Sequence, residues 1–163
     1  MSEKATITLV SGNGSAGHTK GGPISAGSGV LHHLGFVVPS ISAAAEGFAA
    51  SMSAHWDGRI TYDPVQGVRV AFFRPADARN PVVELVEPAS EASPVSHFLK
   101  KRGGGLHHMC YEVKDLDSTL REAKGAGFGV VAPPTPAVAF EGRRIAWINR
   151  NRLLMELLER DDE

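Results

Sequence analysis

Apolar and polar positions follow the same order of patterns in two long stretches of the chain. In the first stretch, an apolar segment over 31–38 ends at Pro39, and apolar residues then recur at helical spacing from Ile41 to Met52. Ser40 is a suitable N-cap for that helix. Three strand-like segments follow, over 59–62, 68–73 and 82–86. The pattern predicts one strand, one helix and then three strands.

The second stretch repeats this order. An apolar segment over 106–113 precedes Asp115, which can cap a helix with Leu116, Leu120 and Ala123 on one face, stopped by Gly125. Further strands are predicted over 130–131, 144–148 and 153–158. The chain therefore reads as two β-α-β-β-β modules.

The predicted organisation places both modules in one domain. The 163-residue chain is long enough for one well-buried core and short for two unrelated domains. Residues 1–29 are rich in Gly and Ser, and we expect a flexible leader there. The remaining segments are a first module over 30–88, a connector with a short helix over 89–105, and a second module over 106–159.

Composition narrows the possible partners and compartments. The 17 Lys and Arg residues nearly balance the 18 Asp and Glu residues, which argues against nucleic acid or an anionic membrane as a partner. Cys110 is the single cysteine, so no intrachain disulfide forms and a reducing compartment is expected. We find neither a long apolar run nor a secretory signal pattern, and these observations predict a cytoplasmic protein.

The repeat also carries candidate chemistry. The tetrapeptide Leu31-His32-His33-Leu34 recurs as Leu106-His107-His108-Met109, and each copy precedes a strand-like segment that contains a glutamate. These glutamates are Glu84 and Glu156, which follow the second histidine of their copy by 51 and 48 residues. Each module thus offers an imidazole and a carboxylate.

Strand geometry selects one histidine from each pair. Successive side chains of a strand point to opposite faces, so the pattern directs His33 and His108 to the concave side, and their neighbours away from it. A carboxylate inside an apolar strand is costly unless it is paired, protonated or bound to metal. We therefore predict that His33, Glu84, His108 and Glu156 bind one divalent cation, such as cobalt, zinc, nickel, manganese or iron(II).

A structural explanation of the same residues is also open. A His in an apolar strand is often a core residue, and each glutamate can instead form a salt bridge with Arg69 or Arg144. We expect the three histidines outside the repeat, His18, His55 and His97, at the surface. We expect the lone cysteine, Cys110, in the core.

Several segments resemble a known family. They include 31–38, 83–88, 105–109 and 154–157, and together the matching segments span residues 30–159. The chain resembles the vicinal oxygen chelate, or glyoxalase-like, superfamily, and looks most like its methylmalonyl-CoA epimerase family. The resemblance implies an α+β fold in which two βαβββ modules pair into a curved, open, barrel-like sheet with a central metal-binding cleft.

The resemblance also implies roles for these residues. The four predicted ligands would bind the metal, and Glu156 would also be the catalytic base that removes a proton from the carbon between a thioester and a carboxylate. The implied substrate is acyl-CoA-like, and a homodimer is expected. The modules can pair within one chain or across a dimer. Val70 stands where some members have a second catalytic glutamate, and Glu141 is a candidate replacement.

Other functions remain open at this point. A glyoxalase-like isomerase or lyase acting on a thiol adduct uses a similar ligand set. A ring-cleaving dioxygenase needs two histidines and one carboxylate on iron, and the additional Glu84 argues against it. A non-catalytic small-molecule-binding protein of the same fold needs a groove and no metal.

Overall fold

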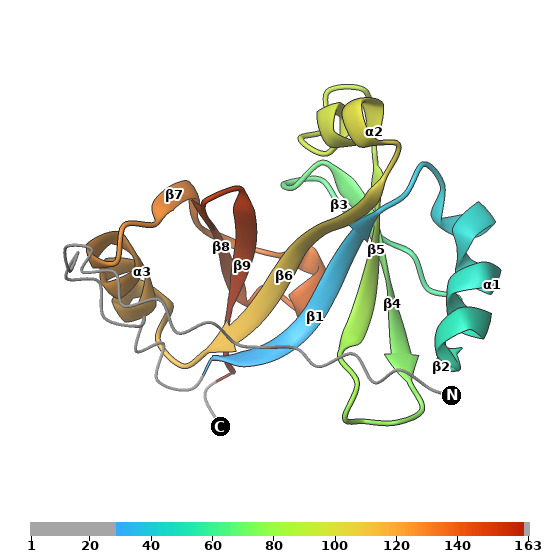
Figure 1. The fold of residues 1–163 in the computed structure, drawn as a ribbon, viewed down its shortest axis with the longest axis horizontal. Coiled ribbons are helices and arrows are strands. Elements are labelled where there is room, and N and C mark those ends of the chain that lie inside the picture. Colours follow the sequence, from blue (N-terminus) through green and yellow to red (C-terminus); the bar gives the residue numbers. More distant parts are fainter. Residues whose placement is uncertain (1–28, 162–163) are drawn as a thin grey trace, which may run out of the picture.

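The computed structural model describes residues 29–161 of the chain, which form a nine-stranded sheet with three α-helices and one short 3-10 helix (Figure 1). The elements of the first half are β1 (Val30–Val37), α1 (Ile41–Met52), β2 (Ala54–His55), β3 (Thr61–Asp63), β4 (Val68–Pro75) and β5 (Val82–Pro88). The connector contains α2 (Ser96–Arg102). The second half has β6 (Gly105–Val113), α3 (Leu116–Gly125), β7 (Gly129–Pro136), the 3-10 helix η1 (Val138–Phe140), β8 (Arg144–Arg150) and β9 (Leu153–Glu159).

The sheet is arranged symmetrically about its two central strands. The strand order is β2-β4-β5-β1-β6-β9-β8-β7, with β3 paired to β4. β1 and β6 are antiparallel neighbours, and each has a parallel partner from its own module, β5 and β9. Figure 1 shows the other strands diverging from the central pair, with α1 and α3 at opposite ends of the molecule. The two modules therefore pair within one chain.

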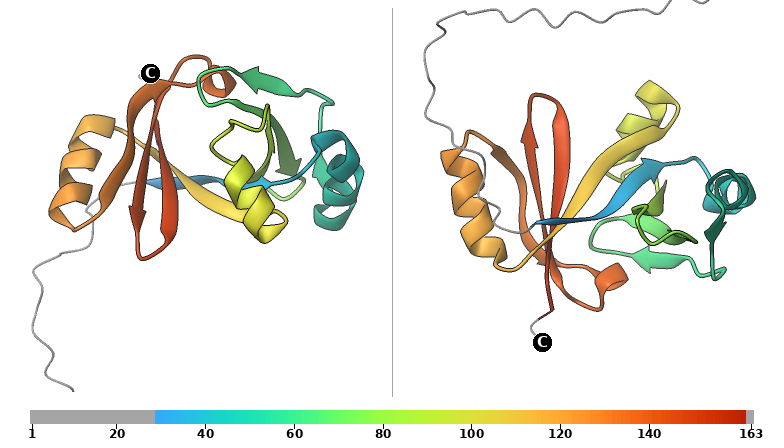
Figure 2. Two further views of the ribbon diagram at one scale, coloured as in Figure 1. Left: turned by 90° about the horizontal axis from the view of Figure 1, so that it is seen from above. Right: turned by 60° about the horizontal axis from the view of Figure 1, so that its bottom comes forward.

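The predicted α+β fold is confirmed, and the sheet stays open. Figure 2 shows that the sheet is strongly bent and does not close into a barrel. Each helix packs against the outer face of its own module: α1 through Ile41 and Ala45, and α3 through Leu116 and Leu120. The opposite, inner faces of the two halves are left to line a shared interior.

The helix caps match the sequence prediction. The side chain of Ser40 accepts a hydrogen bond from the Ala43 backbone N–H at 3.3 Å, and that of Asp115 accepts one from Ser118 N–H at 2.8 Å. The predicted stop at Gly125 is nearly correct: α3 includes this residue, and the glycine with positive φ is Gly127.

Three features differ from the sequence prediction or lie outside the structure. The two-residue strand β2 was not predicted, and β7 is longer than the predicted 130–131. The expected leader over 1–29 lies outside the described residues except for Gly29, as does His18. The module boundaries stay predictions.

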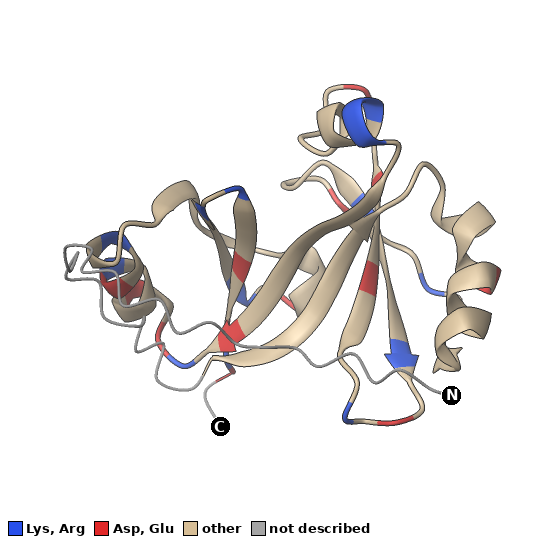
Figure 3. Ribbon diagram, in the orientation of Figure 1, with Lys and Arg blue, Asp and Glu red and all other residues tan. Residues whose placement is uncertain are grey.

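Charged residues are scarce on the central strands. Figure 3 shows most of them on helices, loops and strand ends, with acidic positions inside β5 and β9 as exceptions. Within residues 29–161, no helix has both the length and the apolar character needed to span a membrane.

Candidate metal centre

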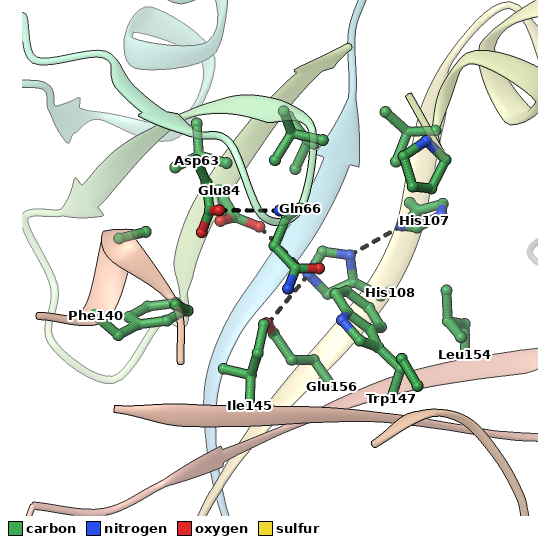
Figure 4. A pocket seen from close by; sticks show the side chains of 18 of the residues that line it. Asp63, Gln66, Glu84, His107, His108, Phe140, Ile145, Trp147, Leu154 and Glu156 are labelled. Atoms are coloured by element: carbon green, nitrogen blue, oxygen red, sulfur yellow. Dashed lines mark hydrogen bonds and ion pairs between the residues drawn. The ribbon is translucent and has the colours of Figure 1, made fainter. Parts of the chain in front are cut away.

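Four strands bring the predicted ligands together. His33 lies on β1, Glu84 on β5, His108 on β6 and Glu156 on β9, and all four side chains are buried. Their exposed fractions lie between 0% and 5%. Figure 4 shows Glu84, His108 and Glu156 pointing into one pocket from different strands. The central pairing of β1 with β6, and the parallel strand beside each, create this convergence.

The donor atoms are spaced as ligands of one ion would be. The two imidazole Nε2 atoms lie 3.2 Å apart. Glu84 Oε2 lies 3.4 Å from His33 Nε2 and 3.3 Å from His108 Nε2. Glu156 Oε2 lies 3.2 Å and 3.6 Å from the same two nitrogens. Donors bound tetrahedrally to one zinc-sized ion at about 2.1 Å are separated by about 3.4 Å, so the His–His and His–Glu distances fit. The donor atoms of His33, His108 and Glu156 all lie within 4.8 Å of one another.

Backbone register makes room for the second imidazole. In the β1–β6 pairing, His33 lies opposite Cys110 and Gly35 lies opposite His108. A Cβ atom at position 35 would overlap the ring of His108. The glycine is therefore required for the close approach of that imidazole to the centre.

Aromatic side chains enclose both imidazoles. Phe72 on β4 packs edge-on against His33, with ring centroids 5.9 Å apart, and Trp147 on β8 packs against His108 at 4.8 Å. Phe140 of η1 stacks on His33 from the other module at 5.8 Å. Rigid aromatic walls of this kind restrict the rotation of the imidazoles.

The arginines considered as alternative partners bind other glutamates. Arg69 Nη1 lies 3.1 Å from Glu87 Oε1, and Arg144 Nη2 lies 2.6 Å from Glu159 Oε1. These two glutamates follow the buried pair by three residues in each module. The alternative explanation, in which Arg69 or Arg144 forms a salt bridge with a central carboxylate, is therefore wrong.

The electrostatics of the centre favour positive charge between the carboxylates. Burial alone would raise the pKa of Glu84, but the imidazoles of His33 and His108 lower it to about 2. Burial alone would lower the pKa of His33, yet Glu84, together with the neighbouring Cys110 and Glu156, raises it well above its ordinary value. A bound cation would supply the same positive charge.

The residues present fit a divalent cation. In the described part of the chain, Glu156 Oε2 is one of two buried side-chain polar atoms without a hydrogen-bond partner, although it lies close to both Nε2 atoms. A buried, unpaired carboxylate oxygen is costly unless a ligand satisfies it. Two imidazole nitrogens and two carboxylate oxygens suit zinc, cobalt, nickel or manganese.

A cavity of about 310 Å³ opens beside the centre. Its walls are mainly apolar and come from both modules, including Val70, Val86, Ile145 and Trp147. Among the described residues, the polar or ionisable side chains that line it are Asp63, Gln66, Glu84, His107, His108 and Glu156. The described lining contains no Lys or Arg, so an anionic ligand would need a metal ion for charge compensation.

Asp63 connects the cavity to the second module. Its Oδ1 accepts hydrogen bonds from the backbone N–H groups of Val65 and Gln66, both at 2.9 Å, and its Oδ2 accepts one from Val138 N–H at 3.1 Å. Asp63 is buried, and it anchors η1, the helix that carries Phe140. The sequence analysis missed this role because the partner amide lies 75 residues away.

The sequence prediction that both first histidines point away from the cavity is wrong for His107, which lines it together with His108. The physical reason is an irregular strand pairing that leaves one residue of β6 unpaired at this position. Burial and the neighbouring His108 lower the pKa of His107 to about 4, and burial, followed by His33, lowers the pKa of His32.

The remaining candidates lie elsewhere. Glu141 is exposed and lines two other grooves with Arg74, outside the cavity lining. His55 and His97 are exposed, as expected. Cys110 is fully buried, as predicted, and burial and Glu156 raise its thiol pKa.

Comparison with known proteins agrees with the fold. The model of the Glyoxalase/Bleomycin resistance protein/Dioxygenase superfamily matches residues 32–147. The chain therefore belongs to this superfamily, the vicinal oxygen chelate proteins. Within it, the relatives support the epimerase family. The Ethylmalonyl-CoA/methylmalonyl-CoA epimerase of Cereibacter sphaeroides is 33% identical over 133 residues, which cover 79% of this chain and 96% of that protein.

Solved structures with a similar fold also include methylmalonyl-CoA epimerases. A hypothetical protein from Bacillus halodurans C-125 superimposes with a TM-score of 0.73 at 30% identity, covering 83% of this chain and 97% of that one. Methylmalonyl-CoA epimerase from Mycobacterium tuberculosis gives a TM-score of 0.70 at 27% identity, with 81% and 88% covered. A Streptomyces coelicolor methylmalonyl-CoA epimerase variant in complex with 2-nitronate-propionyl-CoA gives 0.68 at 25% identity, with 81% and 97% covered.

Proposed function

We propose that this protein is a metal-dependent epimerase that exchanges the proton on a carbon between a thioester and a carboxylate, with methylmalonyl-CoA as the first substrate to test. The observation that carries the proposal is the convergence of two imidazoles and two carboxylates at one side of an apolar cavity. The names of the similar epimerases support the choice of substrate class.

In this proposal the metal ligands are His33, Glu84, His108 and Glu156. A divalent cation held by them supplies a Lewis acid that stabilises the negative charge developing beside the acidic carbon. The imidazoles of His33 and His108 would hold the cation in a fixed position, because their rings are packed against aromatic side chains.

The cavity suits a small, branched, anionic acyl group. Its apolar walls can contact an alkyl substituent, whereas the substrate carboxylate finds no Lys or Arg in the described lining. Two buried glutamates would repel such an anion in the metal-free protein. We therefore expect the acyl group to bind only to the metal-loaded form.

Glu156 is the proposed catalytic base. Its carboxylate is buried and lines the cavity, so the oxygen that does not bind the cation is available to accept a proton. Asp63 also lines the cavity, but its two oxygens already accept three backbone N–H groups. Val70 has no ionisable side chain, so in this proposal a water molecule donates a proton to the opposite face of the carbon, and the hydroxide left behind takes up the proton held by Glu156.

The test is proton exchange from heavy water. With cobalt-loaded protein, methylmalonyl-CoA should incorporate one deuterium at the carbon between its two carbonyl groups and lose its stereochemical purity, and metal-free protein should give neither change. Protein that binds one metal per chain yet exchanges no proton on methylmalonyl- or ethylmalonyl-CoA would overturn the proposal. Isomerisation of a glutathione hemithioacetal by that same protein would assign the glyoxalase-like alternative.

Both halves of the proposed centre come from one chain, so one protomer contains the complete ligand set. The homodimer stays a prediction, for which size-exclusion chromatography with light scattering is the measurement.

A further inference from the structure

The pairing of β1 with β6 is irregular at two places, and each involves one histidine. Leu31 pairs with Tyr111 and His33 pairs with Cys110, so His32 is an extra residue on β1. Farther along, Gly35 pairs with His108 and Phe36 pairs with Leu106, so His107 is an extra residue on β6. The first histidine of each His-His pair is thus the residue without a partner in the β1–β6 pairing.

These irregularities bring each histidine pair together. In a regular strand, adjacent side chains point to opposite faces, and their rings do not meet. An extra residue in one strand locally re-aims the side chains beside it. His32 Nδ1 lies 2.9 Å from His33 Nδ1, and His107 Nδ1 lies 3.0 Å from His108 Nδ1. The same contact therefore occurs in both modules.

Together with a bound metal, this Nδ1–Nδ1 contact would determine which ring nitrogen of each histidine carries the proton. The Nε2 atoms of His33 and His108 face the centre, where each lies within 3.6 Å of both carboxylates. A metal ligand must present a lone pair, so each ligand ring would carry its proton on Nδ1. That N–H can donate to the neighbour's Nδ1 only if the neighbour is neutral and protonated on Nε2.

We propose that His32 and His107 are positioning residues that fix the ring orientation and tautomer of the two metal-binding histidines. This inference rests on the proposed metal centre. Metal-binding histidines commonly donate their second ring N–H to a carboxylate, carbonyl or water, and loss of that partner weakens metal binding. Among the described residues, each ligand's Nδ1 lies within hydrogen-bond distance of the adjacent histidine's Nδ1.

The positioning rings are themselves held by aromatic contacts. His32 packs edge-on against Phe140, with ring centroids 5.6 Å apart. His107 packs edge-on against Phe98 of α2 at 4.9 Å and contacts Trp147 at 6.2 Å. Each acceptor is therefore fixed before a metal binds, so little ordering is required at that moment.

The experiment compares two substitutions at each position. His32→Phe and His107→Phe keep an aromatic ring and remove the acceptor, whereas His32→Asn and His107→Asn keep an acceptor near the position of Nδ1. The metal-free protein is titrated with zinc in competition with a chelator, and its melting temperature is measured separately. His97→Phe, on the exposed surface of α2, is the matched control.

We expect each Phe variant to weaken zinc binding by about 10- to 100-fold, as losses of such partners generally do. The Asn variants should recover most of that loss, and the control should bind like the wild type. A purely structural role would lower the melting temperature of the metal-free Phe and Asn variants alike, without selective recovery of affinity. Phe variants that bind zinc as tightly as the wild type, or Asn variants as weak as the Phe variants, would overturn the inference.

A nitrogen-15 imidazole spectrum of the zinc-loaded wild-type protein gives a test that needs no substitution. His33 and His108 should carry their protons on Nδ1, and His32 and His107 on Nε2. The opposite assignment would remove this inference and leave the metal centre intact. Wild-type protein that binds no metal would remove both proposals, so the two failures are distinguishable.

Discussion

The first module, from β1 to β5, and the second, from β6 to β9, present the same groups to the centre in different surroundings. His33 and His108 occupy matching positions on the two central strands, and Glu84 and Glu156 occupy matching positions on the parallel strands beside them. The backbone framework therefore accounts for the convergence of the four proposed ligands.

The surroundings differ in three places. Among the described residues, Glu156 has a fully buried oxygen without a hydrogen-bond partner, whereas Glu84 has no oxygen that is both fully buried and unpaired. Gly35 of the first module faces His108, and the matching residue of the second module, Cys110, faces His33. Phe140 of the second module covers an imidazole of the first. Duplication thus accounts for the convergence of the four side chains, and departures from symmetry give the two halves of the centre different surroundings.

The largest expected effect is the difference in proton-exchange rate between substitutions of the two buried glutamates, Glu84 and Glu156. Glu156→Gln should lower the rate of proton exchange on methylmalonyl-CoA by about 10²- to 10⁴-fold, because the proposed base is lost. Glu84→Gln should lower it by about tenfold or less, because Gln can still coordinate a metal through its oxygen. Deuterium incorporation measured at saturating cobalt, with metal content determined for both variants, checks this difference.

Equal losses of exchange in the two variants, at equal metal content, would show that the carboxylates act symmetrically. The assignment of Glu156 as the single base would then be wrong.

The second comparison concerns the residues opposite the two imidazoles. Gly35→Ala should weaken zinc binding by about 10- to 100-fold, because the new methyl group overlaps the His108 ring and must displace it. Cys110→Ala at the matching position removes atoms instead of adding them, so we expect a smaller loss of affinity. Chelator competition gives both values, and identical affinities for Gly35→Ala and wild type would contradict the steric argument.

Much of this site could be predicted from the sequence because the relevant signals were local or repeated. The helix caps at Ser40 and Asp115 depend on residues three positions apart. The ligand set was visible because the His-His and Glu patterns occur twice. Strand alternation then selected His33 and His108 correctly as inward-facing residues.

The features that were missed depend on contacts between distant residues. The skipped positions at His32 and His107 arise from the register between two strands about 75 residues apart, which neither strand encodes alone. β7 was predicted too short because Pro133 and Pro134 disfavour a strand. Prolines are tolerated there because β7 is the edge strand of the sheet.

A third prediction concerns Asp63, which accepts a hydrogen bond from Val138 N–H and so joins the first module to η1 of the second. Asp63→Asn should lower the free energy of unfolding by about 1–3 kcal/mol, because an amide N–H₂ would face one of the three backbone N–H donors that the carboxylate now accepts. Urea denaturation measures the change. Asp57→Asn is the matched control, since Asp57 is exposed and accepts one backbone N–H, from Arg59. An equal, small change in both variants would show that Asp63 does not anchor η1.

The smallest expected effect is a difference in stability between substitutions of Glu87 and Glu159, which follow the buried glutamates by three residues. Glu87 accepts a hydrogen bond from Arg69 and another, at 2.8 Å, from the backbone N–H of Ile41 at the start of α1. Glu159 is bonded by Arg144, and that arginine also donates to Asp117 of α3.

Glu87→Ala should therefore lower the free energy of unfolding by about 1 kcal/mol, as expected for the loss of a helix N-terminal acceptor. Glu159→Ala should cost less, because Arg144 keeps its second partner and the pair is partly exposed to solvent. Urea midpoints at unchanged slope give both values. A larger loss for Glu159→Ala would mean that the second module depends more on its arginine bridge than the first depends on its capped helix.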